Sequence, residues 1–170
     1  IGALLLMLLL LSSNVCAQTD TLLYPLKNVP LLSGNFGELR ATHLHTGLDF
    51  KTGGREGLPV ICVKDGVVAR VKVSATGYGN ALYLEHEGGI TTVYGHLSRF
   101  VPRIAKVVRN IQYNKESFEV DENMSGYELR FRAGDTIAYS GNTGSSGGPH
   151  LHFELWNKGR PVNPEKYIVF

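Results

Sequence analysis

Residues 140–155 read SGNTGSSGGPHLHFEL, a glycine- and serine-rich run that leads into a short apolar segment with two histidines. If residues 150–155 are extended, successive side chains alternate between faces, so His150 and His152 project from one face and the intervening apolar residues from the other. Glycines have no Cβ atom, so another strand or a substrate can approach their backbone closely. The stretch therefore predicts a strand that directs two imidazoles into one open space. On its own, the pattern fits either a metal site or a polar sheet face.

Length and composition indicate one globular domain. The chain has 170 residues, of which 43% are hydrophobic and 19% are charged, which is enough apolar material for a buried core. The net charge of +2 is small, so nothing indicates a nucleic-acid partner.

An N-terminal appendage, residues 1–17, resembles a signal peptide. It has an uninterrupted apolar run at 3–11, followed by small residues with Val15 and Ala17 at the two selective positions of a cleavage site. The run is shorter than the ~20 apolar residues of a membrane-spanning helix. We expect an N-terminally truncated signal peptide, no transmembrane segment in the mature chain, and export to the periplasm, the cell envelope or the medium. The alternative is a lipid anchor on Cys16, although Val15 is bulky for that signal.

The segment 18–32 is an irregular lead-in with two prolines. From residue 59 to residue 98 the pattern is β: runs of β-branched and aromatic residues are broken by Asp-Gly, Gly-Asn and Gly-Gly pairs. Short strands joined by tight turns predict an all-β fold, mainly antiparallel, in which the sheet folds on itself. Cys62 lies in one of the apolar runs and is expected to be a buried small hydrophobe.

Residues 100–113 break the β pattern. Their apolar residues recur at helical spacing and predict a single short helix. The polar segment after it is expected to form a hairpin with arms at 117–120 and 127–131. The region 101–130 could wall a substrate groove, or it could be a solvated excursion.

His45 and Asp49 form a second motif, His-Thr-Gly-Leu-Asp. In an extended strand the two residues would lie ~13 Å apart, too far to share an ion bound at ~2 Å, so the chain must bend, and Gly47 supplies a place. With the two histidines of the first motif, this gives imidazole and carboxylate donors without a thiolate. Such a set suits a catalytic Zn²⁺ with three protein ligands and an open fourth position. His43 could replace His45 as a ligand.

Three further residues remain to be interpreted, and two of them are open to two interpretations. His96, in Tyr-Gly-His-Leu-Ser, is either part of the site or a strand-end histidine bonded to a carbonyl. His86, between two glutamates, is expected to be a turn residue. Glu154 shares the strand face of His152, so it either orients an imidazole or is a surface carboxylate.

The motifs FGELR, HTGLD, DGVV, YGN, YGHLS, GDTIAYSGNTGSSGGPHLHFEL and PVNP resemble the lysostaphin and LytM type of zinc metalloendopeptidase, which cuts peptides of bacterial peptidoglycan. The resemblance runs in order over about residues 33–165. It implies a small, mainly antiparallel β domain at 33–170 with the metal at the floor of a groove and an insertion at about 101–130. It also implies that His45, Asp49 and His152 bind the metal and that His96 and His150 are catalytic without binding it.

The function that this resemblance implies is hydrolysis of peptidoglycan peptides by a metal-activated water, in a monomer. Which bond is cut does not follow from the motifs, and we expect the stem-peptide crosslink. Two alternatives remain: a non-catalytic relative that activates other cell-wall hydrolases, and a small secreted zinc-binding domain without hydrolase activity.

Overall fold

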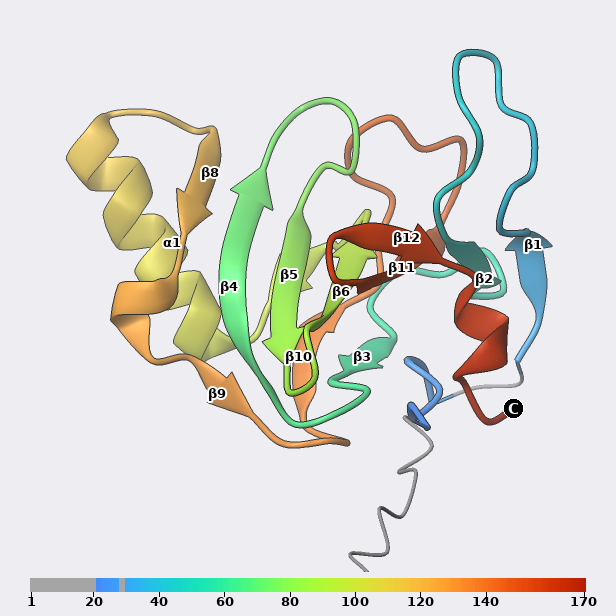
Figure 1. The fold of residues 1–170 in the computed structure, drawn as a ribbon. Coiled ribbons are helices and arrows are strands. Elements are labelled where there is room, and N and C mark those ends of the chain that lie inside the picture. The colour runs from blue at the N-terminus through green and yellow to red at the C-terminus, as the bar shows by residue number, and fades with distance from the viewer. Residues whose placement is uncertain (1–20, 28–29) are drawn as a thin grey trace, which may run out of the picture.

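Two antiparallel sheets make up most of the structure, a computed structural model that describes residues 21–27 and 30–170 (Figure 1). The larger sheet has the order β1-β2-β11-β6-β5-β4-β8, with β12 beside β11 and β9 beside β4. Its strands are β1 (Leu32–Gly34), β2 (Leu48–Lys51), β4 (Gly66–Val73), β5 (Ala81–His86), β6 (Ile90–Gly95), β8 (Val120–Asn123), β9 (Arg130–Phe131), β11 (His150–Asn157) and β12 (Arg160–Val162). The smaller sheet has the order β3-β10-β7, with β3 (Pro59–Ile61), β7 (Arg99–Phe100) and β10 (Thr136–Tyr139). The prediction of a mainly antiparallel all-β fold is confirmed.

The core lies on one face of the larger sheet. Along β11, Leu151, Phe153 and Leu155 are fully buried in it, as the strand's alternation predicts. The smaller sheet contributes to the same cluster through Val60 and Ile137. Because the odd-numbered residues of β11 face the core, its even-numbered residues lie on the opposite face of the sheet, which is called the outer face below.

Register places the residues of the two motifs side by side. β11 pairs with β2 on one side and with β6 on the other, and His152 lies opposite Asp49 and Gly95. Residues that face each other in an antiparallel pair have side chains on the same face, within about 5.5 Å of each other. Pairing of strands about 100 residues apart in sequence therefore brings Asp49 to His152.

The predicted helix is present as α1 (Pro102–Lys115), which begins with a proline and buries Ile104, Val108 and Ile111. The predicted hairpin after it is wrong. β8 and β9 do not pair with each other; both pair with the outer edge of β4, and the short helix η1 (Ser125–Tyr127) lies between them. β4 is eight residues long, so the edge that does not pair with β5 has enough backbone N–H and C=O groups to pair with both strands.

The lead-in packs against the domain in its described part. Leu22 and Leu26 are buried, and Leu22 forms a parallel bridge with Ile168, just after the short helix η2 (Pro164–Lys166). Cys62 is fully buried, as expected, and burial raises the pKa of its thiol to about 12. The expected signal peptide and Cys16 lie outside the described residues. Among those that are described, no helix is long and apolar enough to cross a membrane.

Candidate metal centre

Three side chains from the two motifs converge on one point at the edge of β2 and β11. Asp49 Oδ1 lies 3.1 Å from His45 Nε2 and 2.9 Å from His152 Nδ1. The two histidine nitrogens are 3.0 Å apart. All three residues are buried, and one donor atom from each lies within 4.8 Å of the others. This set of donors could hold a metal ion.

The bend between His45 and Asp49 occurs at Gly47, as predicted. The chain turns there before β2 begins at Leu48. A Cβ atom at residue 47 would lie 2.3 Å from the carbonyl oxygen of Phe153, a distance that real side chains do not adopt. Glycine is therefore required because the bend presses directly against the backbone of β11.

Each of the two histidines has one ring nitrogen held by a neighbour. His45 Nδ1 is 2.8 Å from the carbonyl oxygen of Asn35, so it donates its proton there and its Nε2 lone pair faces the cluster. His152 Nε2 is 3.1 Å from Glu154 Oε1, so a proton on Nε2 can be donated there, which leaves Nδ1, 2.9 Å from Asp49 Oδ1, as the nitrogen that faces the cluster. Because a metal-binding imidazole needs one free lone pair and one donated N–H, both rings have the partners that the metal-binding form requires.

Glu154 is 1% exposed, so its interpretation as a surface carboxylate is wrong. It accepts hydrogen bonds from Tyr78 at 2.5 Å, from the Trp156 indole at 2.7 Å, from His152 and from Thr46. Burial alone would raise the pKa of Glu154, but the hydrogen bonds outweigh it and hold the pKa below its usual range. Glu154 is therefore an ionised carboxylate behind His152.

Arg40 supports Asp49 from the other side, and sequence analysis missed it. Its Nη2 donates to Asp49 Oδ2 at 2.8 Å and also contacts Glu38 at 3.0 Å. Burial would raise the pKa of Asp49, but hydrogen bonds with His152 and His45 hold it well below its usual range. The signal was present in the sequence, since Arg40 is the last residue of FGELR, yet nothing in a linear motif pairs it with Asp49.

Tyr78 was also missed. Its ring stacks on His152 with the ring centres 4.8 Å apart, and burial together with the charge of Glu154 raises the pKa of its hydroxyl. Its motif, Tyr-Gly-Asn, carries no charge or metal donor that would mark it in a sequence.

His96 and His150 lie together beside the three donors, with ring centres 4.7 Å apart. His150 Nδ1 is 2.8 Å from the carbonyl oxygen of Gly148, and its Nε2 is 3.6 Å from Asp49 Oδ1. His96 Nδ1 is 2.8 Å from the carbonyl oxygen of Thr143, so the expected bond to a carbonyl is present. The other ring nitrogen of His96, Nε2, is not used by this bond. Burial lowers the pKa of His96 to about 4, so its ring is neutral at pH 7.

The remaining histidines do not join the cluster. His43 is exposed and contacts Thr42 Oγ1 at 3.0 Å, and the three-donor group contains His45 instead. The prediction that His86 is a turn residue is wrong, because it ends β5 with its ring buried. Its two nitrogens contact the carbonyl oxygen of Asp65 and the hydroxyl of Thr92.

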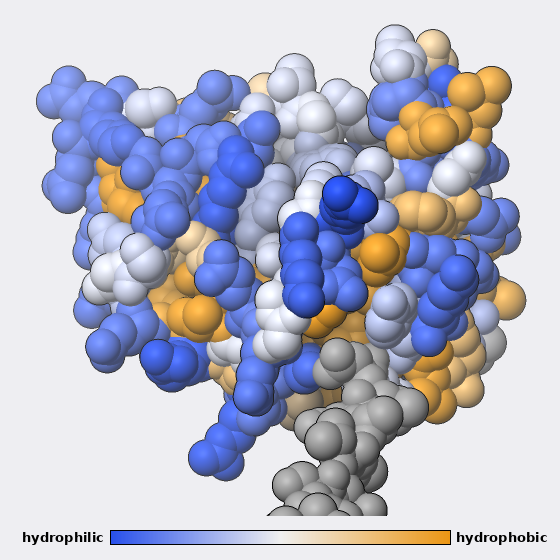
Figure 2. Space-filling model, viewed as in Figure 1, coloured by the Kyte–Doolittle hydropathy of each residue, from blue (hydrophilic) through white to orange (hydrophobic). Residues whose placement is uncertain are grey.

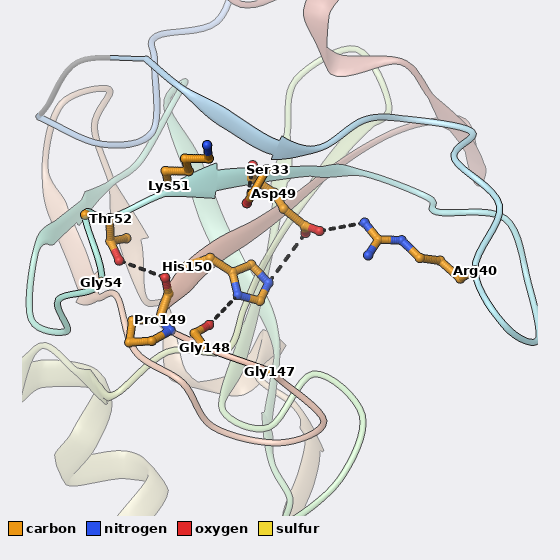
Figure 3. Close-up of a pocket in the computed structure, with 11 residues that line it drawn as sticks. Ser33, Arg40, Asp49, Lys51, Thr52, Gly54, Gly147, Gly148, Pro149 and His150 are labelled. Atoms are coloured by element: carbon orange, nitrogen blue, oxygen red, sulfur yellow. Dashed lines mark hydrogen bonds and ion pairs between the residues drawn. The ribbon is translucent and has the colours of Figure 1, made fainter.

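The cluster opens into two adjoining cavities. One, of about 360 Å³, is reached past Tyr78, Ser146 and the loop that carries Arg40 and His43. The other, of about 390 Å³, has Asp49 and His150 in its wall, and in Figure 3 Arg40 and His150 point toward Asp49 from opposite sides. The structure describes all of residues 101–130, and none of them lines either cavity. The insertion therefore does not wall this site; it is also more than a solvated excursion, because α1 packs into the core.

Comparison with known proteins points to one family. Residues 43–113 and 121–164 match peptidase family M23. The chain is 36% identical over 126 residues to the DD-carboxypeptidase/endopeptidase Mpg of Neisseria meningitidis, covering 74% of this chain and 23% of that protein. It is 30% identical over 115 residues to the murein hydrolase activator NlpD of Escherichia coli, covering 68% and 24%. The chain thus spans about a quarter of the length of these relatives.

Solved structures agree in fold. A zinc-containing peptidase from Vibrio cholerae superposes with a TM-score of 0.61 at 28% identity, covering 82% of this chain and 37% of that one. The catalytic domain of lysostaphin from Staphylococcus simulans superposes with a TM-score of 0.57 at 24% identity, covering 80% and 90%. Since the match to the family covers most of the chain and the structure clusters a set of metal donors, this chain belongs to peptidase family M23, a family of metal-dependent hydrolases.

Proposed function

We propose that this chain is a zinc metalloendopeptidase that hydrolyses peptide bonds in bacterial peptidoglycan. The observation that carries the proposal is the cluster of His45, Asp49 and His152 with two further histidines beside it. The Mpg relative is named a DD-carboxypeptidase/endopeptidase, which favours a peptide substrate. By the same likeness we propose that the bond cut is the stem-peptide crosslink.

The residues fit zinc as the metal. Two imidazoles and one carboxylate form an open three-ligand set, whereas a structural zinc usually has four ligands that include thiolates. The one thiol in the described part of the chain, Cys62, is buried in the core. A bound Zn²⁺ would polarise the scissile carbonyl and lower the pKa of the attacking water toward ~7.

In this proposal His150 and His96 handle protons and developing charge. Their Nδ1 atoms are held by the backbone carbonyls of Gly148 and Thr143, which fixes the ring orientations. Their Nε2 atoms are then available to accept a proton from water or to donate one to the substrate oxygen or the leaving amine. His96 has a left-handed backbone, with φ of 58°, a conformation that costs a residue with a side chain about 1 kcal/mol and is common at functional sites.

A second candidate is a non-catalytic activator of other cell-wall hydrolases, because NlpD is among the relatives. All five positions expected of a catalytic member carry the expected residues here, which favours the enzyme. Digestion of purified peptidoglycan by the zinc-loaded chain, with products identified by mass, tests the proposal. We expect muropeptides with a broken crosslink. Undigested peptidoglycan, combined with stimulation of a separate cell-wall hydrolase, would support the activator instead.

We also propose that the chain works outside the cytoplasmic membrane. The support is the apolar run and small-residue site in residues 1–17, together with a relative that is named as a murein hydrolase activator. In this proposal residues 18–32 are a lead-in to the catalytic domain, residues 33–170, and Leu22 and Leu26 of the lead-in are buried against that domain. Mass analysis of the exported protein should find Gln18 at its N-terminus, whereas a lipidated Cys16 would show the anchored form.

A further inference from the structure

The outer face of the larger sheet holds a third cavity, of about 350 Å³, which the proposed reaction does not use. Three aromatic side chains line it, all of them half-buried: Tyr78, Tyr83 and Trp156. Tyr78 lines both this cavity and the one at the metal centre, so the two spaces adjoin at that ring. In Figure 2, which views this face, pale atoms of intermediate hydropathy lie over β4 and β5 between blue side chains.

Strand register gathers these residues in one place. Tyr83 of β5 lies opposite Arg70 of β4 on one side and opposite Val93 of β6 on the other. Trp156 of β11 lies opposite Thr91 of β6. All of them are on the sheet face that carries the metal donors, because residues opposite each other share a face. The cavity is thus a continuation of the metal centre along the sheet.

The rings of Tyr83 and Trp156 are held in place before any ligand arrives. The Trp156 indole donates to Glu154 Oε2 at 2.7 Å. The Arg70 guanidinium lies 4.9 Å from the centre of the Tyr83 ring and is itself paired with Asp121 at 2.6 Å. A ligand that stacks on fixed rings costs less side-chain entropy than one that must order them, so the surface is suited to binding.

The chemistry of the cavity favours a sugar over an extended peptide. β4, β5, β6 and β11 each have neighbours on both sides, so their backbones are paired and a peptide cannot add to them as another strand. What the surface presents instead is aromatic rings with hydroxyls, from Tyr83 and Thr91, near them. The C–H groups on the face of a pyranose ring pack against an aromatic face, whose negative quadrupole attracts them, while the sugar's hydroxyls bond at the rim.

We propose that Tyr83 and Trp156 form a binding site for the glycan strand of peptidoglycan, beside the metal centre that takes its peptide. This proposal rests on the proposed function. The distances are compatible with it: Trp156 is four residues beyond His152 on one strand, roughly 13 Å at 3.3 Å per residue. An extended stem peptide of about four residues, which joins the sugar to a crosslink, also spans ~13 Å.

Binding of peptide-free glycan chains of alternating N-acetylglucosamine and N-acetylmuramic acid to the whole chain tests the proposal, with calorimetry as the readout. Tyr83→Leu keeps apolar volume over Val93 but removes the ring, and should weaken glycan binding about tenfold. Tyr83→Phe keeps the ring and should bind within about threefold of the unchanged chain. Tyr113→Ala, which removes a ring that is 75% exposed on α1, is the matched control and should change nothing. Thermal unfolding of each variant checks that it is folded.

The rate on intact sacculi divided by the rate on sugar-free crosslinked peptides gives a second readout, and this ratio should fall in Tyr83→Leu. Absence of glycan binding at millimolar concentration, or equal binding by Tyr83→Leu and the unchanged chain, would overturn the site. An equal loss of affinity for sugar-free peptide would show a peptide site instead and would also overturn it. If glycan binds through Tyr83 while no peptide bond is cut, the glycan site stands and the proposed peptidase activity fails.

Discussion

Substitution of Glu154 by glutamine should weaken zinc binding without removing a ligand. The carboxylate accepts hydrogen bonds from His152 and Tyr78 on Oε1 and from the Trp156 indole on Oε2. An amide can accept on its oxygen alone. If the oxygen stays toward His152, the new NH₂ group faces the indole N–H, and if it is reversed, the NH₂ group faces His152 Nε2–H. Either arrangement leaves a buried donor opposed by another donor.

The expected size of the effect follows from the role of Glu154 in holding His152. When the metal is bound, the carboxylate would hold the proton on Nε2 and leave the lone pair on Nδ1 for the metal, and its negative charge would make Nδ1 a stronger metal ligand. Loss of such a partner typically weakens metal binding 10- to 100-fold, equivalent to about 1.4 to 2.8 kcal/mol. Glu154 is 1% exposed, so water cannot replace the lost interaction.

Competition with a chromophoric chelator measures the zinc affinity directly, and thermal unfolding of the metal-free proteins shows whether each variant folds. Glu87→Gln makes the same chemical change at an exposed turn between β5 and β6 and serves as the control. A folded Glu154→Gln variant that binds zinc as tightly as the control would show that Glu154 does not act on the metal centre through His152.

Four further outcomes are expected. His150→Ala and His96→Ala should keep zinc while the hydrolysis rate falls on the order of 10²-fold or more, and metal retained without that loss would refute their catalytic role. His43→Ala should change neither zinc content nor rate, and loss of zinc there would make it a ligand. Gly47→Ala should lower both zinc affinity and melting temperature, because its Cβ would meet the Phe153 carbonyl, whereas Gly126→Ala, with open space around it, should change neither. Burial lowers the pKa of His86, so the folded state favours its neutral ring. The stabilisation from the neutral ring is then fully present above the unfolded pKa of about 6.5, and it falls on acidification by at most about 1.4 kcal/mol per pH unit. The urea midpoint of His86→Asn should therefore change less between about pH 7.5 and pH 5.5 than the midpoint of the unchanged chain. Equal changes in the two proteins would rule this out.

Much of the site could be predicted from the sequence because its residues lie in short motifs, one of which has the alternation of a β-strand. The alternation of residues 150–155 gives the shared face of His150 and His152. If His45 and Asp49 share an ion, strand geometry requires a bend between them, and Gly47 supplies a place for it. The structure brings His45, Asp49 and His152 to one point in the way that the two motifs together suggest. What the motifs could not supply is which strands pair, and the structure shows that β11 lies between β2 and β6.

The residues that sequence analysis misjudged depend on contacts far apart in the chain. Arg40 reaches Asp49 from a loop, and Tyr78 reaches Glu154 from a turn between two other strands. His86 has charged neighbours in sequence, yet its ring faces the core because of its place in the alternation of β5. The hairpin failed for a related reason: each arm found a partner in β4, whose free edge no local pattern reveals.

Titration of the metal-free chain with Zn²⁺ while peptidoglycan hydrolysis is followed tests the central claim most directly. Because the three donors His45, Asp49 and His152 define one site, activity should rise in proportion to added zinc and stop rising at about one equivalent per chain. Asp49→Ala should bind less than one equivalent under the same conditions and remain inactive. Full hydrolysis by the metal-free chain, or the same zinc-dependent activity in Asp49→Ala, would contradict the account.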